Sequence, residues 1–126
     1  MNTDIAQPVR QFYERLAQSD MTGALALLTD DVELIQADSL PYGGCYVGAL
    51  GIQAFFRRFF ACWQAFRSED SRYFVGEGQV VVTSVAHGLT RQGRSITMPM
   101  AQVYTLREGR VSQVRPFYFD TAQLVF

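Results

Sequence analysis

Residues 96–120, ITMPMAQVYTLREGRVSQVRPFYFD, decide the fold of this chain. Two extended stretches, 96–106 and 111–119, flank the tetrapeptide Arg107-Glu108-Gly109-Arg110. A Gly at the second position of a two-residue loop is typical of a primed turn, which suits the right-handed twist of paired strands. The first stretch is apolar on both faces, and such a strand needs cover on both sides. We therefore expect a long hairpin with one face on helices around a cavity and the other against a second subunit or more chain.

The order of the remaining elements predicts an α+β fold. Helical patterns run from Asp4 to a break at Ser19-Asp20 and again over 21–28, and a short strand pattern covers 32–36. Strand patterns over 73–77 and 79–89 and a turn at 91–94 lead into the long hairpin. Helices followed by an antiparallel meander are typical of one curved sheet wrapped around three N-terminal helices.

The strongest helical pattern follows a long irregular loop over 37–48. Its apolar residues recur at i, i+3, i+4 and i+7, as on one face of a helix. They are Ile52, Phe55, Phe56, Phe59, Phe60, Trp63 and Phe66. This aromatic stripe fits packing against the sheet and also fits the wall of a ligand pocket. The loop before it fits either a functional rim or a plain crossover between a strand and a helix.

Length and composition exclude several classes of function. The 126 residues predict one domain over 1–126, and a formal charge of −1 gives no basic surface for nucleic acid. We see neither a secretion signal nor an apolar span, so we expect no membrane partner and a cytoplasmic location, with Cys45 and Cys62 as reduced thiols. One His and scattered acids form no metal-binding pattern, and we expect no metal and no cofactor.

Several short motifs, in this order and spacing, resemble the nuclear transport factor 2-like superfamily, in particular its SnoaL-like branch with the relatives of ketosteroid isomerase. They span nearly the whole chain: Asp30-Asp31-Val32, Gly44-Cys45-Tyr46-Val47-Gly48, Ile52, Phe55-Phe56, Gly78, Val80-Val81-Val82, Met98-Pro99, Val103-Tyr104, Glu108-Gly109-Arg110-Val111 and Tyr118-Phe119-Asp120-Thr121-Ala122. The resemblance implies a cone-shaped sheet, mixed or antiparallel, that encloses an apolar pocket, and a homodimer. The fold alone does not define a reaction.

The family's catalytic positions are replaced in this chain. Ketosteroid isomerase uses an Asp base and two donors to the oxyanion, a Tyr and a protonated Asp. Aligned by the shared motifs, the donor positions hold Phe12 and Ala101, and the base position holds Gln36. The acid/base Asp of SnoaL-type cyclases is matched by Pro116, and the cyclase His by Tyr104. The resemblance therefore implies neither known mechanism.

Two ionisable residues remain as catalytic candidates, Asp38 and His87. A carboxylate held against aromatic walls has its charged form disfavoured and can serve as a base, but an Asp before Ser39 in a loop also caps turns. With a two-residue loop at 91–94, His87 lies opposite Met98, on the face away from Ala101. A register change of one residue would turn it inward.

Two functions fit the sequence. The first is a small-molecule pocket protein that binds an apolar, cyclic or polyketide-like ligand, with Gln36 and Tyr118 as polar contacts. Its expected lining is Phe12, Gln36, Phe59, Trp63, Ala101, Pro116 and Tyr118. An enzyme of this kind would perform isomerase, cyclase or hydratase-like acid/base chemistry, with Asp38 or a water on Gln36 as base.

The second is a non-catalytic dimeric module that binds a ligand or a protein. Its homodimer would pair through the outer face of the sheet, because a large apolar sheet face suits isologous pairing. The expected interface residues are Met98, Met100, Tyr104, Phe117 and Phe119.

Overall fold

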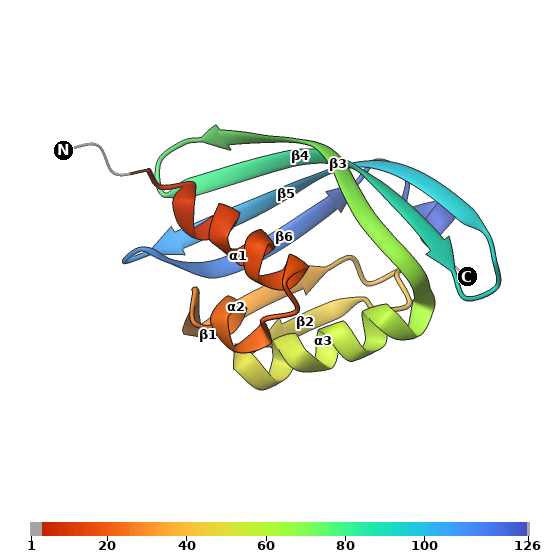
Figure 1. Cartoon of the computed structure of the whole chain (residues 1–126), viewed down its shortest axis with the longest axis horizontal. Coiled ribbons are helices and arrows are strands. Elements are labelled where there is room, and N and C mark those ends of the chain that lie inside the picture. The colour runs from red at the N-terminus through yellow and green to blue at the C-terminus, as the bar shows by residue number, and fades with distance from the viewer. Residues whose placement is uncertain (1–3, 126) are drawn as a thin grey trace.

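The computed structural model describes residues 4–125 and contains three helices and six strands within that range, in the order predicted for an α+β fold (Figure 1). The N-terminal half holds α1 (Gln7–Ala17), α2 (Met21–Leu25), β1 (Leu28–Gln36), β2 (Gly44–Val47) and α3 (Gly48–Cys62). The C-terminal half holds β3 (Trp63–Val75), β4 (Gln79–Thr90), β5 (Ser95–Arg107), β6 (Arg110–Tyr118) and a 3-10 helix, η1 (Thr121–Leu124).

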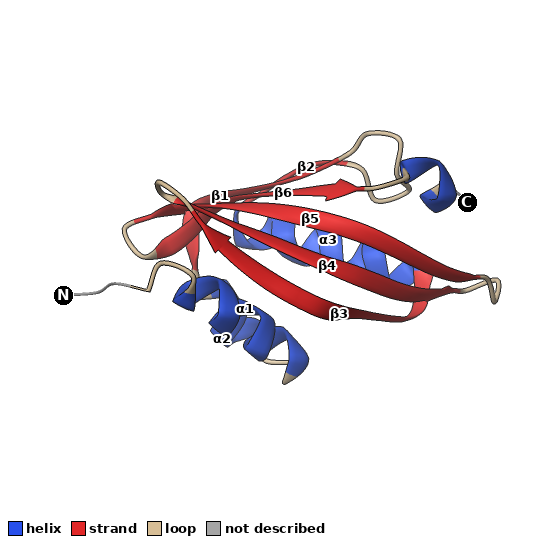
Figure 2. Cartoon of the chain, turned by 90° about the horizontal axis from the view of Figure 1, so that it is seen from above, coloured by secondary structure: helices blue, strands red, loops and turns tan. Residues whose placement is uncertain are grey.

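The six strands form one mixed sheet in the order β2-β1-β6-β5-β4-β3. Neighbouring strands are antiparallel except β1 and β6, which run parallel. The sheet is strongly twisted, and the three helices lie on its inner side (Figure 2). This cone-shaped arrangement confirms the predicted fold class.

The predicted long hairpin is present as β5 and β6. Arg107 lies opposite Arg110, and the two loop residues Glu108 and Gly109 have φ angles of 53° and 78°. Positive φ at both central positions defines a type I′ turn, which brings the twisted strands together without splaying them. The Glu-Gly pair therefore fixes the register of the β5–β6 hairpin.

Several predicted boundaries were wrong, and the largest error concerns the aromatic stripe. The helix ends at Cys62, and Trp63 already has extended angles, φ −118° and ψ 132°. Trp63 and Phe66 belong to β3, whose backbone groups pair with β4 from Trp63 opposite Thr90 onward. Strand pairing thus overrides the helical spacing of these two residues, a tertiary effect that local patterns do not contain.

Two further boundaries differ because strand pairing extends the predicted elements. β1 begins at Leu28 rather than at residue 32, so α2 is shorter than predicted. The loop over 37–48 contains β2, which pairs with β1 through Leu34 opposite Tyr46. The irregular part of the loop is therefore limited to residues 37–43.

The β4–β5 turn sets a register different from the predicted one. Leu89 lies opposite Ser95, and Gly93 has a φ of 92° and donates its N–H to the Thr90 carbonyl at 2.9 Å. A turn followed by a residue in the left-handed region is the three-residue hairpin loop, not the two-residue one. His87 therefore lies opposite Thr97 rather than Met98.

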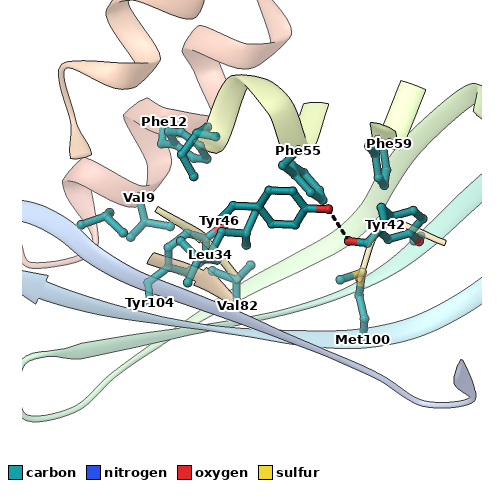
Figure 3. Packing of buried hydrophobic residues seen from close by; sticks show 14 of the residues in the cluster. Val9, Phe12, Leu34, Tyr42, Tyr46, Phe55, Phe59, Val82, Met100 and Tyr104 are labelled. Atoms are coloured by element: carbon teal, nitrogen blue, oxygen red, sulfur yellow. Dashed lines mark hydrogen bonds between the residues drawn. The ribbon is translucent and has the colours of Figure 1, made fainter. Parts of the chain in front are cut away.

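The inner and outer faces of β5 are the reverse of those expected. Met98, Met100 and Tyr104 are at most 8% exposed and belong to the core, so they face the helices. Ala101 pairs with Phe117, which is 53% exposed, and so lies on the outer face. Ala101 therefore does not line the interior, and the expected interface set loses its three β5 residues. Figure 3 shows Met100 and Tyr104 pointing into the core.

Candidate functional site

The interior of the cone contains a small cavity, which we name the Tyr42 cavity. Its volume is about 10 Å³, close to the smallest space that holds one water molecule. It lies where the 37–43 loop, the start of β3, the β4–β5 hairpin, the end of β6 and η1 meet. The lining residues are Tyr42, Trp63, Phe66, Ala86, Gly88, Ile96, Met98, Tyr118 and Leu124.

The walls of the Tyr42 cavity are apolar except for a few hydrogen-bonding groups. The Tyr118 hydroxyl donates to Gln36 Oε1 at 2.9 Å. The Tyr42 hydroxyl is buried and makes no well-formed hydrogen bond, although it interacts with the neighbouring Tyr118 and Trp63 side chains. Burial raises the pKa of Tyr118 to about 12 and raises the pKa of Tyr42 as well. Both hydroxyls are therefore neutral hydrogen-bond donors at physiological pH.

The 37–43 loop holds Tyr42 in place through contacts with α3. The Tyr42 ring packs edge-on against Phe59, with centroids 5.1 Å apart, and against Phe55 at 6.1 Å. The Tyr46 hydroxyl donates to the Tyr42 carbonyl at 3.1 Å, a bond drawn in Figure 3. Arg58 of α3 donates to the Tyr46 hydroxyl at 2.7 Å. The position of the Tyr42 hydroxyl is therefore well defined.

A second polar cluster lies further along the inner face of the sheet and joins α1 to β5. The Tyr13 hydroxyl donates to Gln102 Oε1 at 3.0 Å, and the Tyr104 hydroxyl donates to the Tyr13 hydroxyl at 2.5 Å. Burial raises the pKa of Tyr13 and of Tyr104. This cluster was not predicted from the sequence, because the Gln102 face of β5 was expected on the outside. A polar residue between apolar inner-face residues was the available signal.

The structure brings together some of the predicted ligand-binding residues. Gln36, Trp63 and Tyr118 gather at or beside the Tyr42 cavity, and Phe59 is a neighbour of Trp63, with ring centroids 6.2 Å apart. Pro116 is buried on the inner face and pairs with Gln102. Phe12 is buried beside Tyr13 and the second polar cluster, not at the cavity. Tyr42 was not predicted, although it is the one fully buried aromatic residue of the loop.

The two catalytic candidates lie outside the interior. Asp38 is exposed in a turn closed by the bond from the Leu40 N–H to the Ala37 carbonyl, so it has no aromatic wall around it. His87 is on the outer face, where its Nε2 lies 3.2 Å from Glu69 Oε2 and its Nδ1 lies 3.4 Å from Thr97 Oγ1. Neither side chain can reach a molecule held inside the cone in this structure.

A second hollow lies at the surface, near the start of α3. It has a volume of about 120 Å³ and is lined by Leu25, Leu28, Thr29, Asp30, Val32 and Ala49. The Thr29 hydroxyl is already bonded to Asp31, at 2.9 Å. Because no buried polar group points into this hollow without a partner, the Tyr42 cavity is the stronger candidate.

Over residues 4–125, no group of three or more His, Cys, Asp or Glu side chains could hold a metal ion. None of the helices in this range is long and apolar enough to cross a bilayer.

Comparison with known proteins places this geometry in a family. An NTF2-like protein of unknown function from Burkholderia pseudomallei K96243 is similar to this chain, with 27% identity, 98% of both chains covered and a TM-score of 0.89. TerC, co-crystallised with polyporic acid, has the same fold at 21% identity, with 98% of both chains covered and a TM-score of 0.86. So does a protein from Xanthomonas campestris pv. campestris named provisionally as a polyketide cyclase, at 19% identity, 96% and 93% coverage and a TM-score of 0.80.

No functionally curated protein matches the chain. The sequence pattern of the SnoaL-like domain, however, matches residues 9–114, which make up most of this chain. The chain therefore belongs to the SnoaL-like domain family, with an NTF2-like fold.

Proposed function

We propose that this protein binds a small apolar, cyclic or polyketide-like molecule inside the cone, at the Tyr42 cavity. The observation that carries this proposal is a buried aromatic wall that contains a hydroxyl, that of Tyr42, which makes no well-formed hydrogen bond. Ligand sites commonly combine apolar walls with a few well-placed polar groups, and here Gln36 and Tyr118 add an acceptor and a donor. TerC, crystallised with polyporic acid, supports the idea that this fold holds such molecules.

The proposed role is binding rather than acid/base catalysis. Phe12, Gln36, Ala101 and Pro116 replace the family's ionisable groups, and the exposed position of Asp38 removes the environment that would make it a base. Isomerase, cyclase or hydratase-like chemistry on such a ligand would depend on a water held by Gln36, beside the neutral Tyr118 donor.

The first test is native mass spectrometry of the protein as purified from cells, followed by analysis of whatever is released on denaturation. We expect one small apolar molecule per chain. Trp63 is the only tryptophan and lines the cavity, so its fluorescence should also change when apolar ring compounds are added. An empty protein whose Trp63 fluorescence ignores these compounds would contradict the proposal.

We propose further that two copies of the chain pair through the outer face of β4, β5 and β6. This face carries Ala101 and Val103 of β5 beside Phe117 of β6, which is 53% exposed. Apolar sheet faces of this kind suit isologous dimers. The second candidate function is therefore a non-catalytic interaction module that works as such a dimer.

Sedimentation analysis of Phe117→Arg tests the dimer. We expect the unchanged chain to sediment as a dimer and Phe117→Arg as a folded monomer, because two like charges would meet near the two-fold axis. Leu50→Arg is the matched control, since Leu50 is 81% exposed on α3 and lies away from the outer face. A monomeric parent protein, or a dimer that survives Phe117→Arg, would contradict this placement.

A further inference from the structure

The chain after β6 closes the Tyr42 cavity from one side. The Phe119 N–H donates to the Pro99 carbonyl at 3.0 Å, and η1 follows directly with Asp120 as its cap. Figure 2 shows η1 beyond the end of β6, at one end of the sheet. The Leu124 side chain is only 2% exposed and forms part of the cavity wall.

Two of the contacts that hold η1 to the rest of the molecule are exposed or weak. Arg94 of the β4–β5 connection donates from its guanidinium to the Gln123 carbonyl, and this contact is exposed. The Asp120 N–H donates to the Met98 sulfur, a weak acceptor. The opposite wall is firmer, because the 37–43 loop is bonded and packed to α3 through Tyr46 and Phe59. If a ligand enters the Tyr42 cavity, η1 is therefore the wall that yields.

The Tyr42 hydroxyl indicates what such a ligand carries. This side chain is fully buried, and its hydroxyl makes no well-formed hydrogen bond. Buried polar groups in native proteins nearly always have a well-formed hydrogen bond, so a hydroxyl that has only imperfect contacts with Tyr118 and Trp63 calls for an explanation. Its raised pKa keeps it a neutral donor, which suits an acceptor oxygen of a ligand.

We propose that Leu124 occupies the place of an apolar ring of the ligand, and that Tyr42 selects rings that bear a carbonyl oxygen. The inference rests on the proposed binding function and names the specificity residue and the displaced side chain. Loss of a buried Leu side chain can open an apolar cavity of about 150 Å³, which takes a benzene ring. Displacement of Leu124 therefore converts a space for one water into a space for a monocyclic ketone.

The test uses two probes of nearly equal size, acetophenone with a carbonyl and ethylbenzene without one. The single indole N–H resonance of Trp63 reports binding to the cavity during NMR titration. We expect Leu124→Ala to bind both probes at least about tenfold more tightly than the unchanged chain, because the ring no longer has to displace the side chain. Leu50→Ala is the control, since Leu50 is exposed, and should bind as the unchanged chain does.

Tyr42→Phe, made in the Leu124→Ala background, tests selectivity. Removal of the hydroxyl should lower affinity for acetophenone by about fivefold, the effect of one hydrogen bond, and leave affinity for ethylbenzene unchanged. A preference for acetophenone that survives Tyr42→Phe would overturn the role of Tyr42. Equal affinities of Leu124→Ala and the unchanged chain would overturn the role of Leu124.

A further variant keeps the test decisive if Leu124→Ala does not fold. Arg94→Ala removes a contact of η1 without changing the cavity wall, and it should raise affinity for both probes by a few-fold, whereas unchanged affinity overturns the proposal. Tight binding by the unchanged chain with no effect of any variant overturns this inference but leaves the proposed function intact. Absence of binding in every variant, with no small molecule retained from cells, overturns both.

Discussion

The two faces of the same three strands, β4 to β6, differ in how their apolar residues are used. On the inner face, Val82, Met100 and Tyr104 are at most 8% exposed, and the hydroxyl of Tyr104 is hydrogen-bonded. On the outer face, Val103 is half-buried and Phe117 is mostly exposed, beside the exposed Arg115. The inner face is thus complete within one chain, whereas the outer face has apolar area that one chain does not cover. Hydrophobicity alone does not separate a core face from an interaction face.

The largest expected effect comes from a charge placed on either side of one strand. Tyr104→Asp puts an unpaired carboxylate in the core, so it should cost more than about 4 kcal/mol and leave the chain unfolded. Val103→Asp, one residue away on the outer face, should cost the single chain at most about 1 kcal/mol. Urea unfolding followed by circular dichroism measures both. Similar losses for the two variants would mean that the faces of β5 are assigned incorrectly.

This pair of positions also shows what the sequence could and could not predict. The inner face of β6 was predicted correctly, because Arg115 marks the solvent side of an otherwise apolar strand. β5 has no charged residue between Ile96 and Leu106, and both of its faces are largely apolar. The sequence therefore does not show which alternate residues of β5 face the core. Ala101 was therefore predicted to face inward and Gln102 outward, and the second polar cluster around Gln102 was not predicted.

Other parts of the prediction followed from local rules. The Glu108-Gly109 turn was predicted because a Gly at the second loop position is typical of a primed turn, and both residues have positive φ angles. The end of α3 was not predicted, because the helical spacing of aromatic residues continues past Cys62, whereas the backbone leaves the helix there and pairs with β4. Tyr42 was overlooked because its burial depends on contacts with α3 that the loop sequence does not contain.

Alkaline pH should destabilise the fold through the buried tyrosines of the interior. Burial raises the pKa of Tyr13, Tyr42, Tyr104 and Tyr118, the last to about 12, while an unfolded chain titrates its tyrosines near 10. Above pH 10 the unfolded state therefore binds fewer protons than the folded state, and stability falls as pH rises. These tyrosines contribute their full stabilisation below pH 10 and lose it between pH 10 and their folded pKa values.

The expected slope is about 1.4 kcal/mol per pH unit for each buried tyrosine above pH 10. Urea unfolding at pH 9, 10 and 11 measures it, and absorbance at 295 nm follows tyrosinate formation. Tyr118→Phe should make the slope shallower. Stability that stays constant from pH 9 to pH 11 would contradict the burial of the hydroxyls.

A single methyl group should distinguish the filled interior from the open surface. A Cβ on Gly88 would lie 2.7 Å from Trp63 Cε3 and still closer to Cζ3 of the same ring. Gly88→Ala should therefore cost about 1–3 kcal/mol through overpacking. Gly76→Ala is the matched control, because a Cβ there meets no atom within 4 Å and the change should stay within about 0.5 kcal/mol. Thermal unfolding of both variants decides, and a neutral Gly88→Ala would mean that Trp63 can move away from β4.

The smallest expected effect separates a hydrogen bond on the inner face from the hydrophobic burial around it. Tyr118→Phe keeps the ring but removes the donor to Gln36 Oε1, and Gln36 is 4% exposed. The buried amide oxygen then lacks this partner, so the variant should lose about 1–2 kcal/mol. Tyr118→Phe combined with Gln36→Met removes both partners and should recover part of that loss, because no unsatisfied oxygen remains. A double variant less stable than Tyr118→Phe alone would mean that Gln36 stabilises the interior through contacts other than Tyr118.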